Sequence, residues 1–228
     1  MQQWIVNAAV GEMLRLVTTE DSLCSRKERL MSRQDHLQRN QPLTAGQQAM
    51  VAIWEEHLKG EFTARSTQDT LATMIEEAEV RHVPVLTGGV GKAQLQEFYG
   101  HRFIPQMPPD AENLLLSRTV GADRIVDELL LRFTHTVQMD WILPGIPPTG
   151  KRVEVPLIVC IQFREGKIAW EHIYWDQASV LVQLGLLDAA YLPVVGVEQA
   201  RKALDPTIPS NHLIERADQR REASPGRI

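Results

Sequence analysis

Side chains able to do chemistry recur at every second position from Trp170 to Asp176. Alternate residues of a β-strand share a face, so this spacing would place an imidazole, a phenol and a carboxylate along one line. His172 and Asp176 would then lie about 13 Å apart at ~3.3 Å per residue, which lets both reach one substrate of two or three rings. The spacing makes Asp176 and His172 candidate catalytic residues, with Tyr174 and Trp170 as candidate substrate contacts.

The chemistry that these groups favour is proton transfer near neutral pH. A carboxylate in an apolar pocket has a raised pKa, a neutral histidine is a base or a donor, and a phenol can donate to a developing oxyanion. Each residue also has a structural alternative. Asp176 could cap the helix that follows it, His172 could pack against a backbone carbonyl, and Tyr174 could be a cross-strand aromatic residue.

Five more residues are predicted to line the substrate pocket. Trp54 and His57 fall at helical spacing in an apolar series, and Tyr99 and Phe103 are four apart, so each pair would share a helix face. His135 ends a long strand pattern on its apolar side. Packing in the hydrophobic core is the alternative interpretation for all five.

Composition excludes several classes of function. Lys and Arg number 24 against 29 Asp and Glu, which gives a net charge of −5, whereas nucleic-acid binding needs a basic face. The two cysteines, Cys24 and Cys160, are too few for a disulfide framework or a zinc cage and suit a reducing cytoplasm. The sequence contains no run of about 18 apolar residues, so no membrane span is predicted. The N-terminus lacks the charged region of a signal peptide. We therefore expect a cytoplasmic protein without nucleic-acid or membrane partners.

Neither a metal nor a cofactor is expected from the sequence. Histidines and carboxylates do not cluster at the spacing of metal ligands along the chain, and no nucleotide-binding or metalloprotease motif occurs.

The order of the secondary-structure patterns predicts an α+β fold. The segment from Thr44 to Gln47 is a capping box that begins a helix, and helix, strand and helix patterns continue up to Pro105. Four strand patterns follow between residues 113 and 176, the last two joined by a turn at 164–167. Helices first and an antiparallel meander afterwards favour a curved sheet wrapped around the N-terminal helices, with an apolar pocket inside.

The same patterns divide the chain into three regions. Residues 1–43 are predicted to be a helical or flexible extension, and residues 44–187 the folded domain. Residues 188–228 contain several prolines and are predicted to be a docked extension that ends in a disordered tail.

The domain resembles the SnoaL-like polyketide cyclase branch of the NTF2-like superfamily. The resemblance covers roughly residues 45–187 and is most specific in the last third. Its segments are Thr134-His-Thr136, Gly145-Ile-Pro-Pro-Thr-Gly150, Arg164 through Ile168, Asp176, and Leu181-Val-Gln-Leu-Gly185.

This resemblance implies a cone-shaped α+β barrel that is often dimeric through its sheet. It also implies that Asp176, at the end of a strand, is a general acid/base for intramolecular aldol closure without a cofactor. Members of the family more often have an acidic residue and a tryptophan facing the pocket on the strand before this aspartate. The superfamily also contains epoxide hydrolases, isomerases and dehydratases, so the fold does not settle the reaction.

The resulting prediction is a cofactor-free cyclase, isomerase or lyase that acts on a hydrophobic carbonyl compound. One alternative is a binding protein that uses the same pocket without turnover. Another is an epoxide-hydrolase-like enzyme, which would need Arg132 together with carboxylates such as Asp127 and Asp140.

A homodimer is predicted from the strand at residues 153–163. Both of its faces are largely apolar, although a sheet with one face on its own core should have a polar outer face. A second subunit would cover the extra apolar surface. The outer face would consist of Glu154, Pro156, Ile158, Cys160 and Gln162.

Overall fold

The computed structural model describes residues 42–223, all but the first of which belong to one compact unit that begins at Leu43. Most of the predicted N-terminal extension and the end of the predicted tail lie outside the described residues. Within residues 42–223, no helix has the length and apolar character needed to span a membrane.

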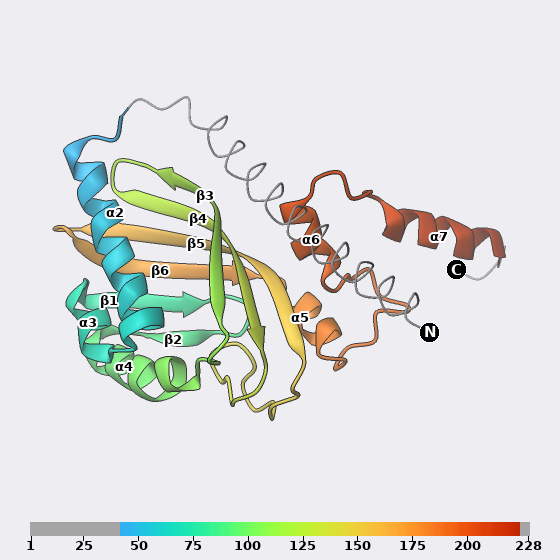
Figure 1. Cartoon of the computed structure of the whole chain (residues 1–228), viewed down its shortest axis with the longest axis horizontal. Coiled ribbons are helices and arrows are strands. Elements are labelled where there is room, and N and C mark those ends of the chain that lie inside the picture. Colours follow the sequence, from blue (N-terminus) through green and yellow to red (C-terminus); the bar gives the residue numbers. More distant parts are fainter. Residues whose placement is uncertain (1–41, 224–228) are drawn as a thin grey trace, which may run out of the picture. The chain divides into compact units, whose positions relative to one another are not determined.

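Helical segments precede and follow a sheet of six strands (Figure 1). The helical segments before the third strand are α2 (Ala45–Leu58), η1 (Lys59–Ala64), α3 (Thr67–Ala72), α4 (Gly91–Glu97), η2 (Phe98–Phe103) and η3 (Ile104–Gln106). The strands are β1 (Met74–His82), β2 (Thr87–Val90), β3 (Glu112–Val120), β4 (Arg124–Thr134), β5 (Arg152–Arg164) and β6 (Lys167–Trp175). Three helices end the described chain: α5 (Gln177–Gln183), α6 (Glu198–Leu204) and α7 (His212–Ala223).

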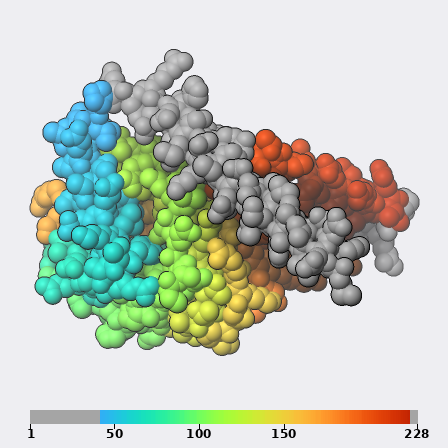
Figure 2. All heavy atoms as spheres, in the orientation of Figure 1, coloured from blue at the N-terminus to red at the C-terminus, as the bar shows by residue number. Residues whose placement is uncertain are grey.

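The strands form a single sheet in the order β2-β1-β6-β5-β4-β3. The meander from β3 to β6 is antiparallel, whereas β1 pairs with β6 in parallel. The curved sheet wraps the helices that precede it, and α2 and α3 lie on the side that Figure 2 presents. The predicted α+β fold is therefore confirmed, with one parallel pair in a sheet expected to be antiparallel.

The predicted capping box begins α2. The Thr44 hydroxyl accepts from the backbone N–H of Gln47, and the Thr44 N–H donates to the Gln47 side chain at 2.9 Å. The Gln47 amide also donates to the carbonyl of Val120, which joins this end of the helix to β3. The buried face of α2 consists of Met50, Trp54 and His57.

Two π-helical turns extend the helices that line the inside of the sheet. The first, η1, continues α2 and buries Glu61, and it ends at Arg65 in the left-handed conformation, with φ 51°. Gly60 within it packs so closely on α3 that an added Cβ would lie 2.8 Å from the Thr70 hydroxyl. Wide turns of this type are common at functional sites. The second, η2, continues α4 and buries Phe98, Tyr99 and Phe103.

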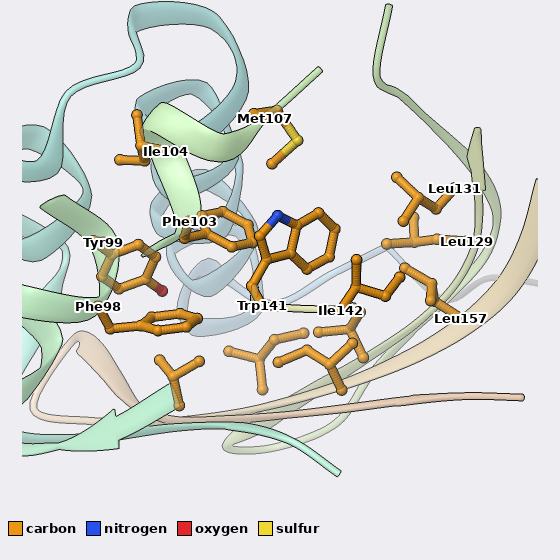
Figure 3. Close-up of a cluster of buried hydrophobic side chains, with 14 of the residues drawn as sticks. Phe98, Tyr99, Phe103, Ile104, Met107, Leu129, Leu131, Trp141, Ile142 and Leu157 are labelled. Carbon is orange, nitrogen blue, oxygen red and sulfur yellow. The ribbon is translucent and has the colours of Figure 1, made fainter. Parts of the chain in front are cut away.

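The inner face of the sheet and these helices enclose the hydrophobic core (Figure 3). On β5 the buried residues alternate strictly from Val153 to Phe163, so the opposite face carries the predicted outer set from Glu154 to Gln162. This alternation does not persist along β6, because the register of the hairpin shifts between Gln162 and Phe163.

The C-terminal extension docks through α5 and α6. The Ser179 hydroxyl donates to the carbonyl of Gly196 at 2.7 Å, and Ala200 of α6 is fully buried. In contrast, α7 has no buried residue.

Candidate active site

A small cavity of about 50 Å³ lies between the helices and the inner face of the sheet. Its wall is largely apolar and aromatic and includes a few polar residues. The apolar lining residues are Trp54, Leu58, Phe62, Val80, Phe98, Phe103, Leu129, Leu131, Leu157, Val159 and Ile173. The lining residues with polar groups are Glu61, His82, Tyr99, Asn113, Trp141 and Glu171. A pocket that is apolar with a few placed polar groups is typical of a small-molecule site.

Three buried ionisable residues meet at one side of this cavity. The Nε2 atom of His57 lies 3.1 Å from an oxygen of Glu61, one helical turn further along the chain. It lies equally close, at 3.1 Å, to Oε1 of Glu171 on β6. The Tyr99 hydroxyl is 3.3 Å from the same nitrogen. All four residues are buried, so their charges interact in a medium that screens little.

The other nitrogen of the His57 ring fixes the tautomer. His57 Nδ1 is 2.7 Å from the Thr73 hydroxyl, which donates its own hydrogen to the carbonyl of Thr70 at 2.6 Å. The Thr73 oxygen must therefore accept, so Nδ1 carries a hydrogen. Nε2 is then the atom that gains or loses a proton, and it faces Glu61, Glu171 and Tyr99.

The electrostatics of the cluster retain a proton near neutral pH. Burial disfavours the charged imidazolium of His57, but the carboxylates of Glu171 and Glu61 outweigh it and raise the pKa to about 9. Burial raises the pKa of Glu171 to about 7, an effect that His57 opposes and Glu61 reinforces. Burial also raises the pKa of Tyr99, so its hydroxyl remains a donor. The cluster therefore presents a carboxyl group whose pKa suits proton exchange with a ligand in the cavity.

A fifth titratable residue, His82, lines another part of the wall. Its ring packs among Phe98, Phe103, Trp141 and Trp175, with centroids 5.5–5.9 Å away. Burial lowers the pKa of His82 to about 4, so the ring is neutral at physiological pH.

Asp127 forms a second buried polar centre beside the cluster. It accepts from Trp54 Nε1 at 2.7 Å and from two nitrogens of Arg118 at 2.8 Å each. This paired contact joins α2, β3 and β4, and neither Asp127 nor Arg118 lines the cavity. We therefore assign Asp127 to the support of Trp54.

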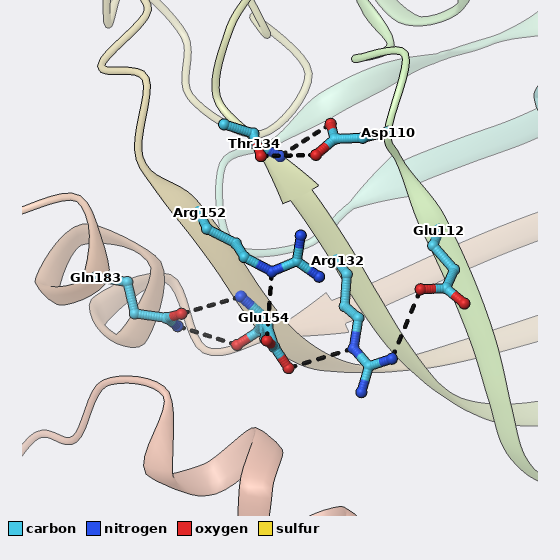
Figure 4. Close-up of polar contacts among 7 residues, drawn as sticks. All are labelled: Asp110, Glu112, Arg132, Thr134, Arg152, Glu154 and Gln183. Atoms are coloured by element: carbon cyan, nitrogen blue, oxygen red, sulfur yellow. Dashed lines mark hydrogen bonds and ion pairs between the residues drawn. The ribbon is translucent and has the colours of Figure 1, made fainter. Parts of the chain in front are cut away.

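The arginine arrangement considered for epoxide opening is not formed. Arg132 contacts Glu112 at 3.6 Å and Glu154 at 3.2 Å on neighbouring strands (Figure 4). Asp140 is paired with Arg102 instead, and Asp127 with Arg118. The combination of Arg132 with Asp127 or Asp140 is therefore wrong.

Asp176 does not face the cavity. It is exposed and is the N-cap of α5, where its side chain accepts from the N–H of Ser179 at 3.2 Å and from Gln199 at 3.0 Å. The predicted placement is wrong, because capping and the contact with α6 use the carboxylate on the surface. Asp176 is therefore not placed to exchange a proton with a ligand in the cavity.

His172, Trp170 and Tyr174 also lie on the outer face of the sheet. The rings of Trp170 and His172 stack at 4.2 Å, Arg124 lies over Trp170, and Tyr174 is 44 % exposed. The prediction that this face lines the pocket is wrong, because the register shift at the start of β6 places Ile168 and Glu171 on the same inner face. None of the three outward residues lines the cavity.

The helical candidates are closer to their predicted places. Trp54, Tyr99 and Phe103 line the cavity, and His57 stacks on Trp54 at 5.4 Å behind the wall. His135 is buried but lies outside the cavity lining, with Thr149 as its neighbour at 3.3 Å. Its predicted role as a pocket residue is therefore wrong.

Sequence reasoning missed Glu61, Glu171, Asn113 and Trp141, and it left open whether His82 faces the pocket or the solvent. Glu171 and Trp175 alternate on the strand face opposite to the one chosen, and they match the acidic residue and tryptophan that the family resemblance implies. That combination was the available signal for Glu171.

His57, Glu61 and Glu171 are also close enough to share a cation, with ligand atoms within 4.8 Å of one another. Within the described part of the chain, this is the group of histidine and acidic residues with such spacing. Spacing along the chain did not predict this group, because residues from α2, η1 and β6 meet only in the folded chain.

Comparison with solved structures identifies the fold. A SnoaL-like protein of Jannaschia sp. CCS1 is 19% identical, with a TM-score of 0.52, and the match covers 65% of this chain and 100% of that one. An NTF2-like protein of unknown function from Burkholderia pseudomallei K96243 is 14% identical, with a TM-score of 0.48, over 60% of this chain and 97% of that one. A protein with a ketosteroid isomerase-like fold from Catenulispora acidiphila, in complex with trimethylamine, is 14% identical, with a TM-score of 0.46, over 59% and 93%. No match was found among the curated proteins.

The family follows from a match over more than half of the chain. The model of the family described as SnoaL-like polyketide cyclase matches residues 47–184, which include most of α2, all six strands and α5. Every residue of the buried cluster falls within this range. The chain belongs to the SnoaL-like polyketide cyclase family.

Proposed function

We propose that this protein is an enzyme of the cyclase, isomerase or lyase type that transfers protons on an uncharged, apolar carbonyl compound. One observation carries the proposal: the Glu171 carboxyl lines an apolar cavity while His57 and Glu61 surround it inside the protein. Its raised pKa of about 7 lets it accept and return a proton near neutrality.

The proposed reaction begins when ionised Glu171 removes a proton from the carbon next to the substrate carbonyl. The C–H bond breaks, its electron pair moves to the carbonyl oxygen, and an enolate forms. Tyr99 lines the same cavity, and its hydroxyl can donate to the enolate oxygen. In an isomerase, a carbon of the enolate system then takes the proton back from Glu171. In a cyclase, the enolate carbon attacks a second carbonyl carbon, and the alkoxide so formed takes the proton from Glu171.

His57 is proposed to act through Glu171. It lies behind the cavity wall and its Nε2 faces both carboxylates, so its positive charge stabilises the ionised form of the base. The Thr73 and Thr70 contacts hold Nδ1 away from the carboxylates, so that Nε2 faces Glu171. His57 is therefore a positioning residue.

An assay that does not require the natural substrate tests the proposal. In D₂O, the protein should speed deuterium incorporation next to the carbonyl of 2-tetralone above the buffer rate. Glu171→Gln should reduce this acceleration by about 10²–10⁴-fold, the usual contribution of general acid–base catalysis. His172→Gln, on the outer face, is the matched control and should exchange as the wild type does.

Two results would contradict the proposal. Tight binding of 2-tetralone without exchange above buffer would favour a binding protein with the same pocket. Loss of exchange on exhaustive chelation, restored by a divalent cation, would replace direct proton transfer with chemistry at a cation. An epoxide-hydrolase-like activity has no supporting observation here, because Arg118 and Asp127 lie outside the cavity lining.

The homodimer is proposed on the outer face of β5 and β6. Ile158 and Tyr174 are opposite each other in the register and are 40 % and 44 % exposed, which leaves an apolar pair unpacked. Near the start of β5, Gln183 of α5 already covers the strand by bonding the N–H and the carbonyl of Glu154. A partner is therefore needed only over the Ile158 end. Sedimentation should give a dimer, and a monomer for Ile158→Glu.

A further inference from the structure

Three buried polar atoms that line the same cavity have no hydrogen-bond partner. They are Oδ1 of Asn113, Nε1 of Trp141 and Oε1 of Glu171. Glu171 has its close contact with His57, but nothing in the described protein meets Asn113 Oδ1 or Trp141 Nε1. Buried polar groups are nearly always hydrogen-bonded, because an unmade bond costs free energy. Two such atoms on one cavity wall are available to bond water or a ligand in the cavity.

The two atoms lie at different depths. Among the lining residues, Leu58, Phe62 and Asn113 are partly exposed and the others are buried, so these three mark the mouth. Trp141 is buried and its ring contacts Phe103 at 5.0 Å, between that residue and the leucines of the sheet (Figure 3). Glu171 is buried as well, on β6. A ligand that enters past Asn113 would therefore reach the buried groups of Trp141 and Glu171.

Trp141 is held firmly enough to act as a fixed donor. Its carbonyl accepts from the Thr87 hydroxyl at 2.7 Å. The preceding residue, Asp140, receives bonds from Gln106 and Gln138, and the carbonyl of Ile142 accepts from Gln177 at 2.9 Å. These contacts fix the segment on both sides, so the indole is part of the wall.

The charge of the wall selects against anions. The cavity lining contains two glutamates, and within the described chain no lysine or arginine belongs to it. A carboxylate or phosphate ligand would therefore be repelled without a compensating cation. The remaining requirements are an apolar body, one acceptor for Trp141 and one donor for Asn113.

We propose that Trp141 and Asn113 form the recognition subsite for an uncharged hydroxy-carbonyl compound. Trp141 Nε1–H donates to a carbonyl oxygen of the ligand, and Asn113 Oδ1 accepts from a hydroxyl at its other end. The apolar body of the ligand lies among the rings and leucines of the wall. The proposal rests on the proposed function for the identity of the site, but it concerns binding and needs no turnover.

The size of the cavity adds one condition. About 50 Å³ holds a few water molecules, far less than a two-ring compound requires. Leu58 and Phe62 are the partly exposed side chains at the mouth, so they are the ones that must move to admit it.

Four related two-ring probes test the subsite by calorimetry. The first, 6-hydroxy-1-tetralone, carries both the carbonyl and the hydroxyl group. The second, 1-tetralone, carries only the carbonyl, the third, 5,6,7,8-tetrahydro-2-naphthol, carries only the hydroxyl, and the fourth, tetralin, carries neither. Trp141→Phe keeps an aromatic ring and removes the donor, so it should weaken the two ketones about 3- to 10-fold and leave the other two unchanged. Asn113→Leu should weaken the two hydroxyl probes by a similar factor.

The controls separate this proposal from the proposed chemistry. Trp170→Phe changes the same residue type on the outer face and should not alter any affinity. Glu171→Gln should reduce the acceleration of exchange on 2-tetralone by about 10²–10⁴-fold yet still bind 6-hydroxy-1-tetralone. If Trp141→Phe weakened the affinity for all four probes equally, Trp141 would only pack against the ligand, and the proposal would be overturned. A wild-type protein that did not bind 6-hydroxy-1-tetralone would overturn it as well. Deuterium exchange on 2-tetralone without the predicted binding selectivity of Trp141 and Asn113 would support the proposed function and overturn the recognition subsite.

Discussion

His57 on α2 and Glu171 on β6 approach to 3.1 Å between Nε2 and Oε1, although they come from opposite ends of the domain sequence. The contact is buried, and Glu61 makes it a three-membered group with two acids and one base. Two carboxylates beside one imidazole leave a negative charge inside the protein unless a proton stays with them. This shortage of positive charge gives the cluster its proton affinity.

The first prediction concerns the pH dependence of catalysis. If ionised Glu171 is the base, deuterium exchange on 2-tetralone should rise with pH and level off above a midpoint of about 7, the pKa of that carboxyl. Glu171→Gln should remove the midpoint along with most of the rate. Rates measured between pH 5 and 8.5 check this, and a flat profile in the wild type would contradict it.

The second prediction concerns stability and His57. Its pKa is raised from 6.5 to about 9 on folding, so the native state binds the proton more tightly than the unfolded chain. The resulting stability is fully present below pH 6.5 and is lost as pH rises through about 9. The difference in unfolding free energy between the wild type and His57→Gln should therefore shrink over that range. Urea denaturation at several pH values measures it, and a difference that grows with pH would show the opposite sign.

The third prediction concerns the support of Trp54. Asp127→Asn removes the charge that pairs with Arg118, so the protein should lose about 3 kcal/mol of stability, the lower end for a buried ion pair because Arg118 is partly exposed. Glu55→Gln removes the other partner of Arg118 at an exposed position and should cost less than about 1 kcal/mol. Equal costs in chemical denaturation would contradict the assignment.

The fourth prediction concerns Asp176 as a cap. Asp176→Ala should destabilise the protein by about 1 kcal/mol through loss of the N-cap, while Asp176→Asn, which can also cap, should cost less. Both variants should exchange protons on 2-tetralone at the wild-type rate. A selective loss of exchange in Asp176→Asn, with stability retained, would return this residue to the catalytic site.

Local patterns predicted the fold well because they depend on neighbours in sequence. The capping box at Thr44 and the alternation along β5 involve residues a few positions apart, and both appear as expected. The parallel pairing of β1 with β6 could not be predicted this way, since it joins strands far apart in the chain.

The site was predicted less well for a specific reason. Parity along β6 was counted from Ile168, but the register shift places Ile168 and Glu171 on one face, so every later position was assigned to the wrong side. A strand pattern contains no signal for a one-residue shift when both faces carry aromatic residues. The helical candidates Trp54 and Tyr99 were predicted correctly, because the apolar face of a helix spans several positions per turn and does not depend on strict alternation.

The close packing of Gly60 on Thr70 has a consequence for the chemistry of the imidazole. Thr70 accepts from Thr73, and Thr73 in turn accepts from His57 Nδ1, so the position of a backbone carbonyl decides which ring nitrogen is protonated. Gly60→Ala would place a methyl group against Thr70 without adding any charge or polar group. Above a pH of about 9, where His57 is neutral, the choice of tautomer would then be relaxed, and the ¹⁵N shifts of His57 would move toward a mixture of the two forms. A single methyl group, on a residue outside the cavity lining, would thus alter the imidazole that supports the base Glu171.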